Sequence, residues 1–227
     1  SFSMPLNNFE PTPIANGPIA AAYSQNVNDV VKHKAAMGTE IGIGIMYHIT
    51  KNLKFKTGLQ YNIRKYYIDS YKSGSTVAGI AIIRNNKLDT INQITNLSTN
   101  LGYAETQLDT KLYQVSVPIG IQWDFLHYKK FGLSIGGSIE PTITLNKNVY
   151  LISTDYKYYT DGTPFLRKWN VNSSAELNLT YKAGNYQLYA GPQIRYQHLP
   201  TYNDQYPIKE FRMDYGFRIG FTKQLLK

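Results

Sequence analysis

Histidines are the residues of this chain best suited to acid–base or metal chemistry, and there are four of them: His33, His48, His127 and His198. None stands at metal-ligand spacing from another, and the chain has no cysteine, so we expect no metal site, no cofactor and no thiolate chemistry. A Ser-His-Glu lipid hydrolase would need a triad that faces outward, whereas Glu40 and His48 share a polar strand face. The sequence therefore predicts a protein that is not an enzyme, with a membrane-embedded lipid-modifying enzyme as the weaker alternative.

Charged residues recur on the polar faces of alternating segments, where a folded sheet would enclose them. An isolated buried charge costs several kcal/mol, so such residues must pair with one another. We expect a salt-bridged network that stiffens the fold, in preference to a proton or solute path, because a small barrel leaves little open lumen. The predicted network consists of Glu40, Lys54, Lys56, Arg64, Glu140, Glu176, Arg195, Arg212, Asp214 and Arg218.

One connecting stretch, residues 150 to 167, is rich in tyrosine and aspartate. Tyrosine rings stack and carboxylates accept hydrogen bonds, so this loop is a candidate contact site for a partner or a glycan. An ordinary hairpin extension is the alternative that the sequence leaves open. The candidate contact residues are Asp155, Tyr156, Tyr158, Tyr159 and Asp161.

The elements that carry these residues show a period of two. In residues 53 to 64, one face is almost wholly apolar and the other has no apolar side chain, which is typical of a strand with one apolar and one polar side. The same alternation recurs in residues 37–49, 113–124, 133–146, 169–182, 186–197 and 211–222. A closed antiparallel barrel with both termini on one side needs an even number of strands, so we predict a short first strand over residues 2–6.

The connections between these strands alternate in length. Residues 50–52, 125–130 and 183–185 form short turns, and residues 7–35, 73–108, 150–167 and 198–209 form long loops. Within the second long loop, the apolar stretch Val77 to Ile83 is a candidate strand hairpin beyond the bilayer. Short periplasmic turns and long extracellular loops are typical of outer-membrane barrels. Pro118, Pro141 and Pro192 fall inside predicted strands, where we expect bulges or kinks that shift the register locally by one.

Alternation alone does not say which face lies inside, and a lipocalin-like soluble barrel is the competing fold. Glycines gather on the polar face, which suits a narrow interior, and aromatic residues such as Tyr47, Trp123 and Trp169 lie near strand ends, as in a membrane girdle. The net charge is +9, but no run of five like charges occurs, so we expect no nucleic-acid partner. The predicted fold is all-β: an eight-stranded antiparallel transmembrane β-barrel, residues 1–227 forming one domain in a bacterial outer membrane.

Three stretches resemble the small outer-membrane β-barrel family of Bacteroidota, the group that includes PorT-like proteins. They are residues 43–61 (IGIMYHITKNLKFKTGLQY), 115–121 (VSVPIGI) and 189–193 (YAGPQ), and the resemblance covers about residues 36 to 225. It implies an outer-membrane location without shared catalytic residues, and some members form the C-terminal barrel of longer trans-envelope anti-sigma proteins. The expected function is a non-enzymatic anchor, scaffold or accessory subunit that contacts outer-membrane lipid, lipopolysaccharide and other outer-membrane or periplasmic proteins. A C-terminal signalling barrel is the alternative.

Overall fold

The computed structural model describes residues 2–11, 30–31, 33–85, 87–100, 102–145 and 148–224. The protein is all-β, and thirteen strands of this part belong to one antiparallel sheet, which confirms the predicted class. The strands are β1 (Phe2–Pro11), β2 (His33–Ala35), β3 (Gly38–His48), β4 (Leu53–Arg84), β5 (Lys87–Ser98), β6 (Ala104–Ser116), β7 (Ile119–Tyr128), β8 (Phe131–Thr144), β9 (Tyr150–Ile152), β10 (Tyr158–Asp161), β11 (Trp169–Ala183), β12 (Tyr186–Gln197) and β13 (Ile208–Lys223). A 3₁₀ turn, η1 (Thr163–Phe165), follows β10. Within the described residues, no helix has the length and apolar character needed to cross a bilayer.

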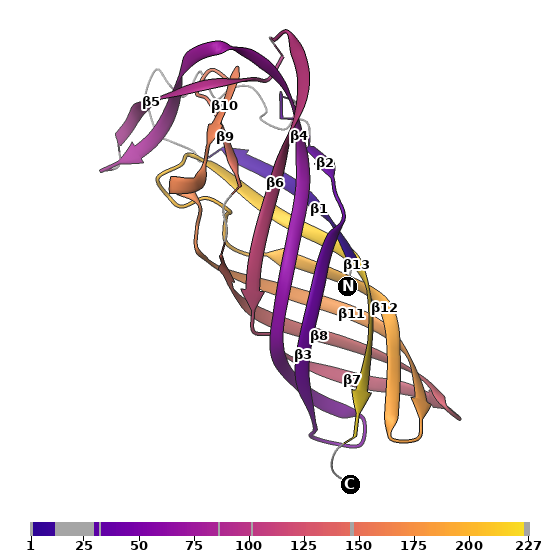
Figure 1. The fold of residues 1–227 in the computed structure, drawn as a ribbon. Helices are drawn as coiled ribbons and strands as arrows, with labels where there is room; N and C mark the ends of the chain where they lie inside the picture. The colour runs from indigo at the N-terminus through magenta and orange to yellow at the C-terminus, as the bar shows by residue number, and fades with distance from the viewer. Residues whose placement is uncertain are drawn as a thin grey trace.

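The strand pairings return to their starting point. β3 pairs with β4, β4 with β7, β7 with β8, β8 with β11 and β11 with β12. β12 then pairs with β13, β13 with β1, and β1 with β3 through Phe2↔Thr39 and Ser3↔Gly38. In Figure 1 β3 and β4 run steeply along the near side, β8 and β11 pass obliquely behind them, and the end of β13 lies among the short turns.

The first strand is present and longer than predicted. β1 pairs with β13 along its whole length, from Phe2↔Phe217 to Pro11↔Ile208. Proline lacks an N–H donor, yet Pro5 lies within the ladder, opposite Asp214. The short N-terminal segment therefore joins β13 to β3.

The prolines act differently from expectation. Pro118 falls in the break between β6 and β7, but the register to β4 is the same on both sides: Gln60↔Ser116 before it and Thr57↔Ile119 after it. The ladder of β11 and β12 is likewise interrupted at Pro192 without a change of register. The predicted one-residue shifts are thus absent at these prolines, because each removes a hydrogen-bond donor without inserting an extra residue.

The connections predicted as long loops contain strands. β4 continues to Arg84, β5 returns antiparallel to it, and β6 begins at Ala104, so most of residues 73–108 is extended. This confirms the strand hairpin expected at Val77 to Ile83, which pair with Ile94 to Leu88 of β5. Residues 150–167 likewise hold β9, β10 and η1. These elements crowd one end, called here the long-loop end, and the turns at 49–52, 129–130 and 184–185 form the opposite, short-turn end (Figure 1). Gly184 (φ 62°) and Lys129 (φ 54°) take the left-handed conformation that such tight turns require.

Candidate functional site: a charged interior closed by an apolar cap

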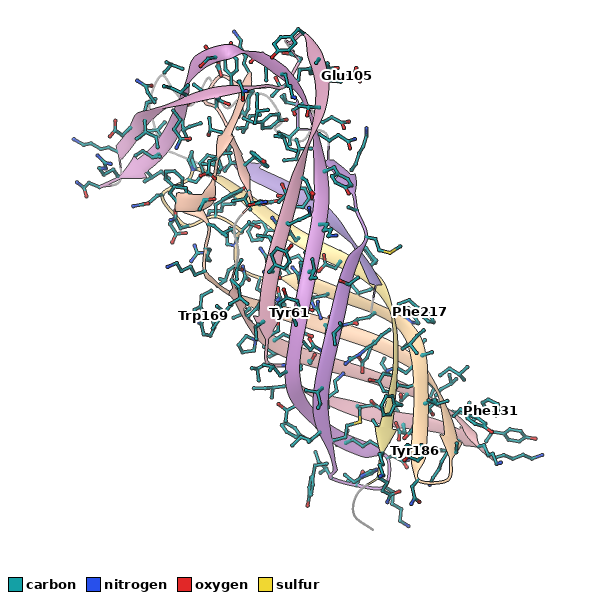
Figure 2. The ribbon with its side chains drawn as sticks, viewed as in Figure 1. Tyr61, Glu105, Phe131, Trp169, Tyr186 and Phe217 are labelled. Atoms are coloured by element: carbon teal, nitrogen blue, oxygen red, sulfur yellow. The ribbon has the colours of Figure 1, made fainter. Side chains whose placement is uncertain are left out.

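The outward face of the sheet is apolar along the half nearer the short turns. Figure 2 shows Phe131, Trp169 and Phe217 projecting outward from the ribbon. This surface, called here the apolar belt, consists of Ile41, Ile43, Ile45, Tyr47, Phe55, Leu59, Tyr61, Val117, Ile119, Ile121, Trp123, Phe131, Ile135, Ile139, Ile143, Trp169, Leu177, Leu179, Tyr186, Leu188, Ile194, Tyr196, Tyr215, Phe217, Ile219 and Phe221, all of them exposed. Soluble monomers rarely expose a continuous apolar surface of this extent.

The inward face of the same half is charged, and β4 shows its order because every second residue from Lys54 points inward. Nearest the short turns, Lys54 Nζ lies 2.7 Å from a carboxylate oxygen of Asp124. One step further along the axis, Lys56 Nζ lies 2.5 Å from Glu176, which also binds Arg218 at 2.7 Å. The two carboxylates and three cations are therefore paired rather than isolated.

The middle of the interior is organised by Arg195. Its guanidinium binds Glu40 and lies 2.7 Å from Glu140, while its N–H groups donate to the side-chain oxygens of Gln60 and Asn62 at 3.3 Å. Arg195 comes from β12, and its partners come from β3, β8 and β4, so one side chain joins the walls of the sheet across the axis. Bonds of this kind between distant strands fix the interior as a packed polar core.

The third group of charges lies further from the short turns. Arg64 binds Asp214 at 2.9 Å, and Arg212 binds Glu210 at 3.1 Å. Arg212 also donates to the hydroxyl of Tyr66 at 3.1 Å and stacks over its ring at 4.8 Å. The Tyr66 ring is where the interior changes from charged to apolar.

All ten residues predicted for the network lie in this interior, and the structure adds two that the prediction missed, Asp124 and Glu210. With them, the interior salt bridges join six cations to six carboxylates: Lys54, Lys56, Arg64, Arg195, Arg212 and Arg218 with Glu40, Asp124, Glu140, Glu176, Glu210 and Asp214. Asp124 stands on the polar face of a recognised alternating segment, so the alternation could have found it. Glu210 precedes the segment recognised at 211–222. This set is neutral, and the net charge of the chain lies on other residues.

The polarity of both faces reverses along the longest strand. Every second residue of β4 points inward, and these residues are mostly polar from Lys54 to Arg64 and then apolar at Tyr66 and Ile68. The residues between them point outward, and they are mostly apolar from Phe55 to Ile63 and then charged at Lys65 and Asp69. β6 repeats the reversal in the opposite chain direction, with Gln114 and then Leu112 and Leu108 inward. Lys65 pairs directly with Lys111, so the outward face changes at the same level on both strands.

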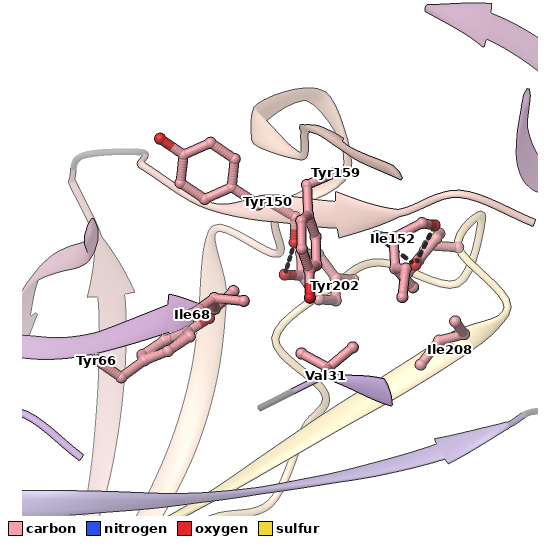
Figure 3. Close-up of a pocket in the computed structure, with 9 residues that line it drawn as sticks. Val31, Tyr66, Ile68, Tyr150, Ile152, Tyr159, Tyr202 and Ile208 are labelled. Atoms are coloured by element: carbon pink, nitrogen blue, oxygen red, sulfur yellow. Dashed lines mark hydrogen bonds between the residues drawn. The ribbon is translucent and has the colours of Figure 1, made fainter. Parts of the chain in front are cut away.

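Beyond this level, buried apolar side chains form what is called here the apolar cap. Its members are Val31, Tyr66, Ile68, Ile80, Ile82, Leu108, Leu112, Val149, Leu151, Ile152, Tyr156, Tyr159, Phe165, Leu166, Tyr202, Tyr206 and Ile208. Tyr66, Tyr159 and Tyr202 line a small space together with Val31 and Ile208 (Figure 3). That cavity is about 10 Å³, close to the smallest space that holds one water molecule, so the cap is packed rather than hollow.

Two cap tyrosines, Tyr202 and Tyr206, donate hydrogen bonds to backbone carbonyls. The Tyr202 hydroxyl donates to the Tyr150 carbonyl at 2.8 Å, and the Tyr206 hydroxyl donates to the Ile152 carbonyl at 3.1 Å. Burial raises the pKa of Tyr156 to about 12, and burial also raises the pKa of Tyr159 and Tyr202. The cap is therefore an apolar core in which neutral phenols are favoured.

The candidate loop contact site is largely taken up by this core. Tyr156 and Tyr159 are buried, at 5% and 1% exposure, and Tyr158 is half-buried. Asp155 and Asp161 are exposed, but each caps its own turn: Asp155 accepts from the Lys157 amide at 3.2 Å and Asp161 from the Thr163 amide at 2.9 Å. The five residues do not form one outward surface, and the tyrosines serve packing.

Glu40 and His48, which share a polar strand face in the sequence, lie far apart in the structure. His48 is exposed near the short turns while Glu40 is bound inside by Arg195, and eight residues of strand separate them by about 26 Å. His198 lies edge-on to the Tyr196 ring at 5.2 Å. Among the described residues, no three metal-liganding side chains lie together. The His33 side chain lies outside the described part.

Comparison of the chain with protein-family models, with curated proteins and with solved structures found no match.

Proposed function

We propose that this chain is an eight-stranded antiparallel β-barrel that spans a bacterial outer membrane. The observation that carries the proposal is the apolar belt around a charged interior. A soluble barrel holds its apolar side chains inside. Burying one large apolar side chain is worth about 1.5–3 kcal/mol, so leaving the belt in water would forgo on the order of tens of kcal/mol, more than the net stability of a typical domain.

The dimensions and the strand circuit support the same proposal. From Phe131 to Ile143 the outward face of β8 covers thirteen residues, or twelve residue steps, which at a tilt of about 40° span roughly 30 Å along the axis. This matches the hydrocarbon thickness of a bilayer. A closed circuit leaves no strand edge for lipid to contact. By this proposal, the short turns lie in the periplasm and the long-loop end lies outside the cell, beside lipopolysaccharide.

Within the membrane, we propose the role of a non-enzymatic and non-conducting anchor, scaffold or accessory subunit of an outer-membrane assembly. The paired charges that fill the interior and the packed cap above them support a closed barrel. Membership of the Bacteroidota barrel family, and a C-terminal position in a longer signalling protein, are proposals that rest on the sequence resemblance.

The membrane proposal is tested by folding the protein from urea into phosphatidylcholine vesicles. Folded protein is expected to migrate faster on a gel before heating than after it, and lipids with brominated chains are expected to quench Trp123 and Trp169, because both lie in the belt. The variant Ile43→Asp/Ile139→Asp/Phe217→Asp, which places three carboxylates in the apolar belt, should fail to insert into the vesicles. Recovery of folded, monomeric wild-type protein in buffer without detergent would contradict the proposal.

Orientation and closure have separate tests. The chain has no cysteine, so single cysteines at Gly74 in the long-loop end and at Asn185 in a short turn report sidedness without background. In intact cells, a membrane-impermeant maleimide should label Gly74→Cys and spare Asn185→Cys. In planar bilayers, wild-type protein should show no steady single-channel conductance, and a stable conductance would overturn the closed anchor.

A further inference from the structure

The short-turn end carries an unusual charge pattern. Five exposed lysines surround it, called here the lysine rim: Lys51, Lys129, Lys130, Lys182 and Lys223. The acidic side chain nearest to them along the chain is Asp124, which is buried and bound by Lys54 at 2.7 Å. Across the described residues, the rim lysines form no salt bridge with a carboxylate within the protein.

The long-loop end differs. Apart from Glu40, whose carboxylate is bound by Arg195 in the interior, the exposed or half-exposed carboxylates among the described side chains lie there: Asp69, Asp89, Glu105, Asp109, Asp155, Asp161 and Asp204. Several cations at that end are bound by them, such as Lys34 by Asp69 at 2.9 Å and Arg167 by Asp204 at 2.8 Å. Acidic groups therefore offset the cations at one end of the molecule, while the rim keeps its positive charge.

The rim lies at the depth of lipid headgroups. Lys129 stacks over the Tyr128 ring at 5.4 Å, and Lys223 stacks over the Tyr186 ring at 5.7 Å. Tyr186 belongs to the apolar belt, and Phe131 of the belt packs against Tyr181 at 5.0 Å beside Lys130 and Lys182 (Figure 2). Aromatic rings of this kind mark the edge of the hydrocarbon. Because the turns are short, they hold the lysines at that edge instead of extending them into water.

Three of the lysines converge. The Lys182 amide donates to the Lys130 carbonyl at 2.7 Å, and Lys129 precedes Lys130 in the same turn. Like charges held together repel one another, and an anion between them relieves that repulsion. A lipid phosphate fits this place because the aromatic rings beside these lysines mark the edge of the hydrocarbon, where lipid headgroups lie.

We propose that the lysine rim binds the headgroups of anionic phospholipids in the leaflet next to the short turns. This inference rests on the proposed membrane location. Each lysine near an anionic surface contributes a preference of about fivefold. Bound lipids would fix the depth and the orientation of the barrel in that leaflet.

The test uses one tryptophan reporter in vesicles of phosphatidylcholine with a minor share of phosphatidylglycerol. The variant Trp123→Phe/Trp169→Phe/Phe131→Trp places the reporter beside Lys129 and Lys130, whereas Trp123→Phe leaves Trp169 near the other edge of the belt. Quenching by brominated phosphatidylglycerol, divided by quenching by brominated phosphatidylcholine in the same mixture, measures the preference for the anionic lipid. We expect a ratio well above one at position 131 and a smaller ratio at Trp169.

Adding Lys129→Asn/Lys130→Gln/Lys182→Gln should lower the ratio at position 131 several-fold, toward one, as should high salt. Asparagine is chosen at position 129 because it tolerates the positive φ there. The matched control, Lys72→Gln/Lys87→Gln/Lys157→Gln, removes as much charge from the long-loop end and should leave the ratio unchanged. If the rim variant folds poorly, the salt dependence of the parent reporter protein decides the question.

A ratio near one at position 131 in the parent reporter protein, or a ratio that the rim variant and salt leave unchanged, would overturn the proposal and assign the rim to an acidic protein partner. Failure of the membrane location itself is distinguishable, because the reporter would then escape quenching by brominated phosphatidylcholine as well.

Discussion

The two halves of this molecule use the same strands with opposite polarity. In the half near the short turns, charges such as Arg195 lie inside and isoleucines such as Ile139 lie outside. In the cap half, Leu151 and Tyr159 lie inside, and Lys65 and Asp69 face outward. The backbone pairing runs through the boundary unchanged, so one sheet carries both arrangements. If the half near the short turns lies in the membrane, as proposed, the surroundings of the outer face decide what the interior contains.

The halves are also held together differently. The interior of the half near the short turns depends on salt bridges and hydrogen bonds, which are strong only while every partner is present. The cap depends on apolar burial, as the core of a soluble protein does. Matched substitutions in the two halves therefore separate the two kinds of stability.

The largest effect is expected from breaking the central charge group. Arg195→Met leaves Glu40 and Glu140 buried without their cation, which should cost about 3–5 kcal/mol of the free energy of unfolding. The measurement is denaturant unfolding of protein folded in vesicles. The matched change near the cap, Arg167→Met, breaks a pair with Asp204, which is 85% exposed at its side chain, and should cost no more than about 1 kcal/mol.

A rescue separates lost pairing from lost packing. Glu40→Gln and Glu140→Gln, added to Arg195→Met, remove the unpaired charges and should restore part of the stability. Equal costs for Arg195→Met and Arg167→Met would show that water reaches the interior charges, and the comparison of the halves would fail.

The next effect is expected in the cap. Leu151 is 1% exposed, and Leu151→Ala should cost about 2–5 kcal/mol by opening a cavity. Because the cap has its own apolar core, we expect amide exchange to accelerate in β9 and β10 while β8 and β11 stay protected. Leu188→Ala, which changes an exposed belt leucine, is the control. Equally faster exchange in both halves would indicate that they unfold as one unit.

A charge placed outside should distinguish the two outer faces. Ile139 in the belt and Val77 on the β4–β5 extension are 59% and 61% exposed, so they differ in surroundings and hardly in exposure. Ile139→Arg should lower the free energy of unfolding in vesicles by about 2–4 kcal/mol, and Val77→Arg should change it by less than about 0.5 kcal/mol. Similar costs at both sites would contradict a lipid boundary between them.

Much of the half near the short turns could be predicted from the sequence, because along each strand there the same alternate positions stay apolar. That pattern located most of the strands of the circuit and placed all ten network residues on polar faces. The pairing of Arg195 with Glu40 and Glu140 could not be predicted, because it joins three strands that are far apart in the sequence.

The cap was missed for a physical reason. Between Arg64 and Tyr66 the alternation continues, but the polar and apolar faces exchange places. A search for a strand with one continuous apolar face therefore stops at this point. The cap core also collects residues from five distant stretches, including those of Ile68, Leu151 and Tyr202. Tyr156 and Tyr159 consequently looked like loop residues, although they are core residues.

The smallest effect is expected from one buried phenol of the cap. Tyrosine in an unfolded chain titrates near pH 10, whereas burial raises the pKa of Tyr156 to about 12. Below pH 10 both states keep the proton and stability is unaffected. Between pH 10 and 12 the unfolded chain loses it first, so stability falls as pH rises and levels off above 12. In thermal unfolding followed from pH 8 to 12.5, Tyr156→Phe should therefore show a shallower fall than wild type.

The control is Tyr103→Phe, whose ring is 77% exposed and meets water in both states, so its curve should follow the wild type. As pH rises, amide hydrogen exchange should accelerate in β9 and β10 before it does in β8 and β11, because the buried tyrosines with raised pKa belong to the cap. If Tyr156→Phe and wild type lose stability alike above pH 10, the phenol is solvated in the folded protein. Water would then reach the cap core, and the two halves would differ only in the charged residues of the other interior.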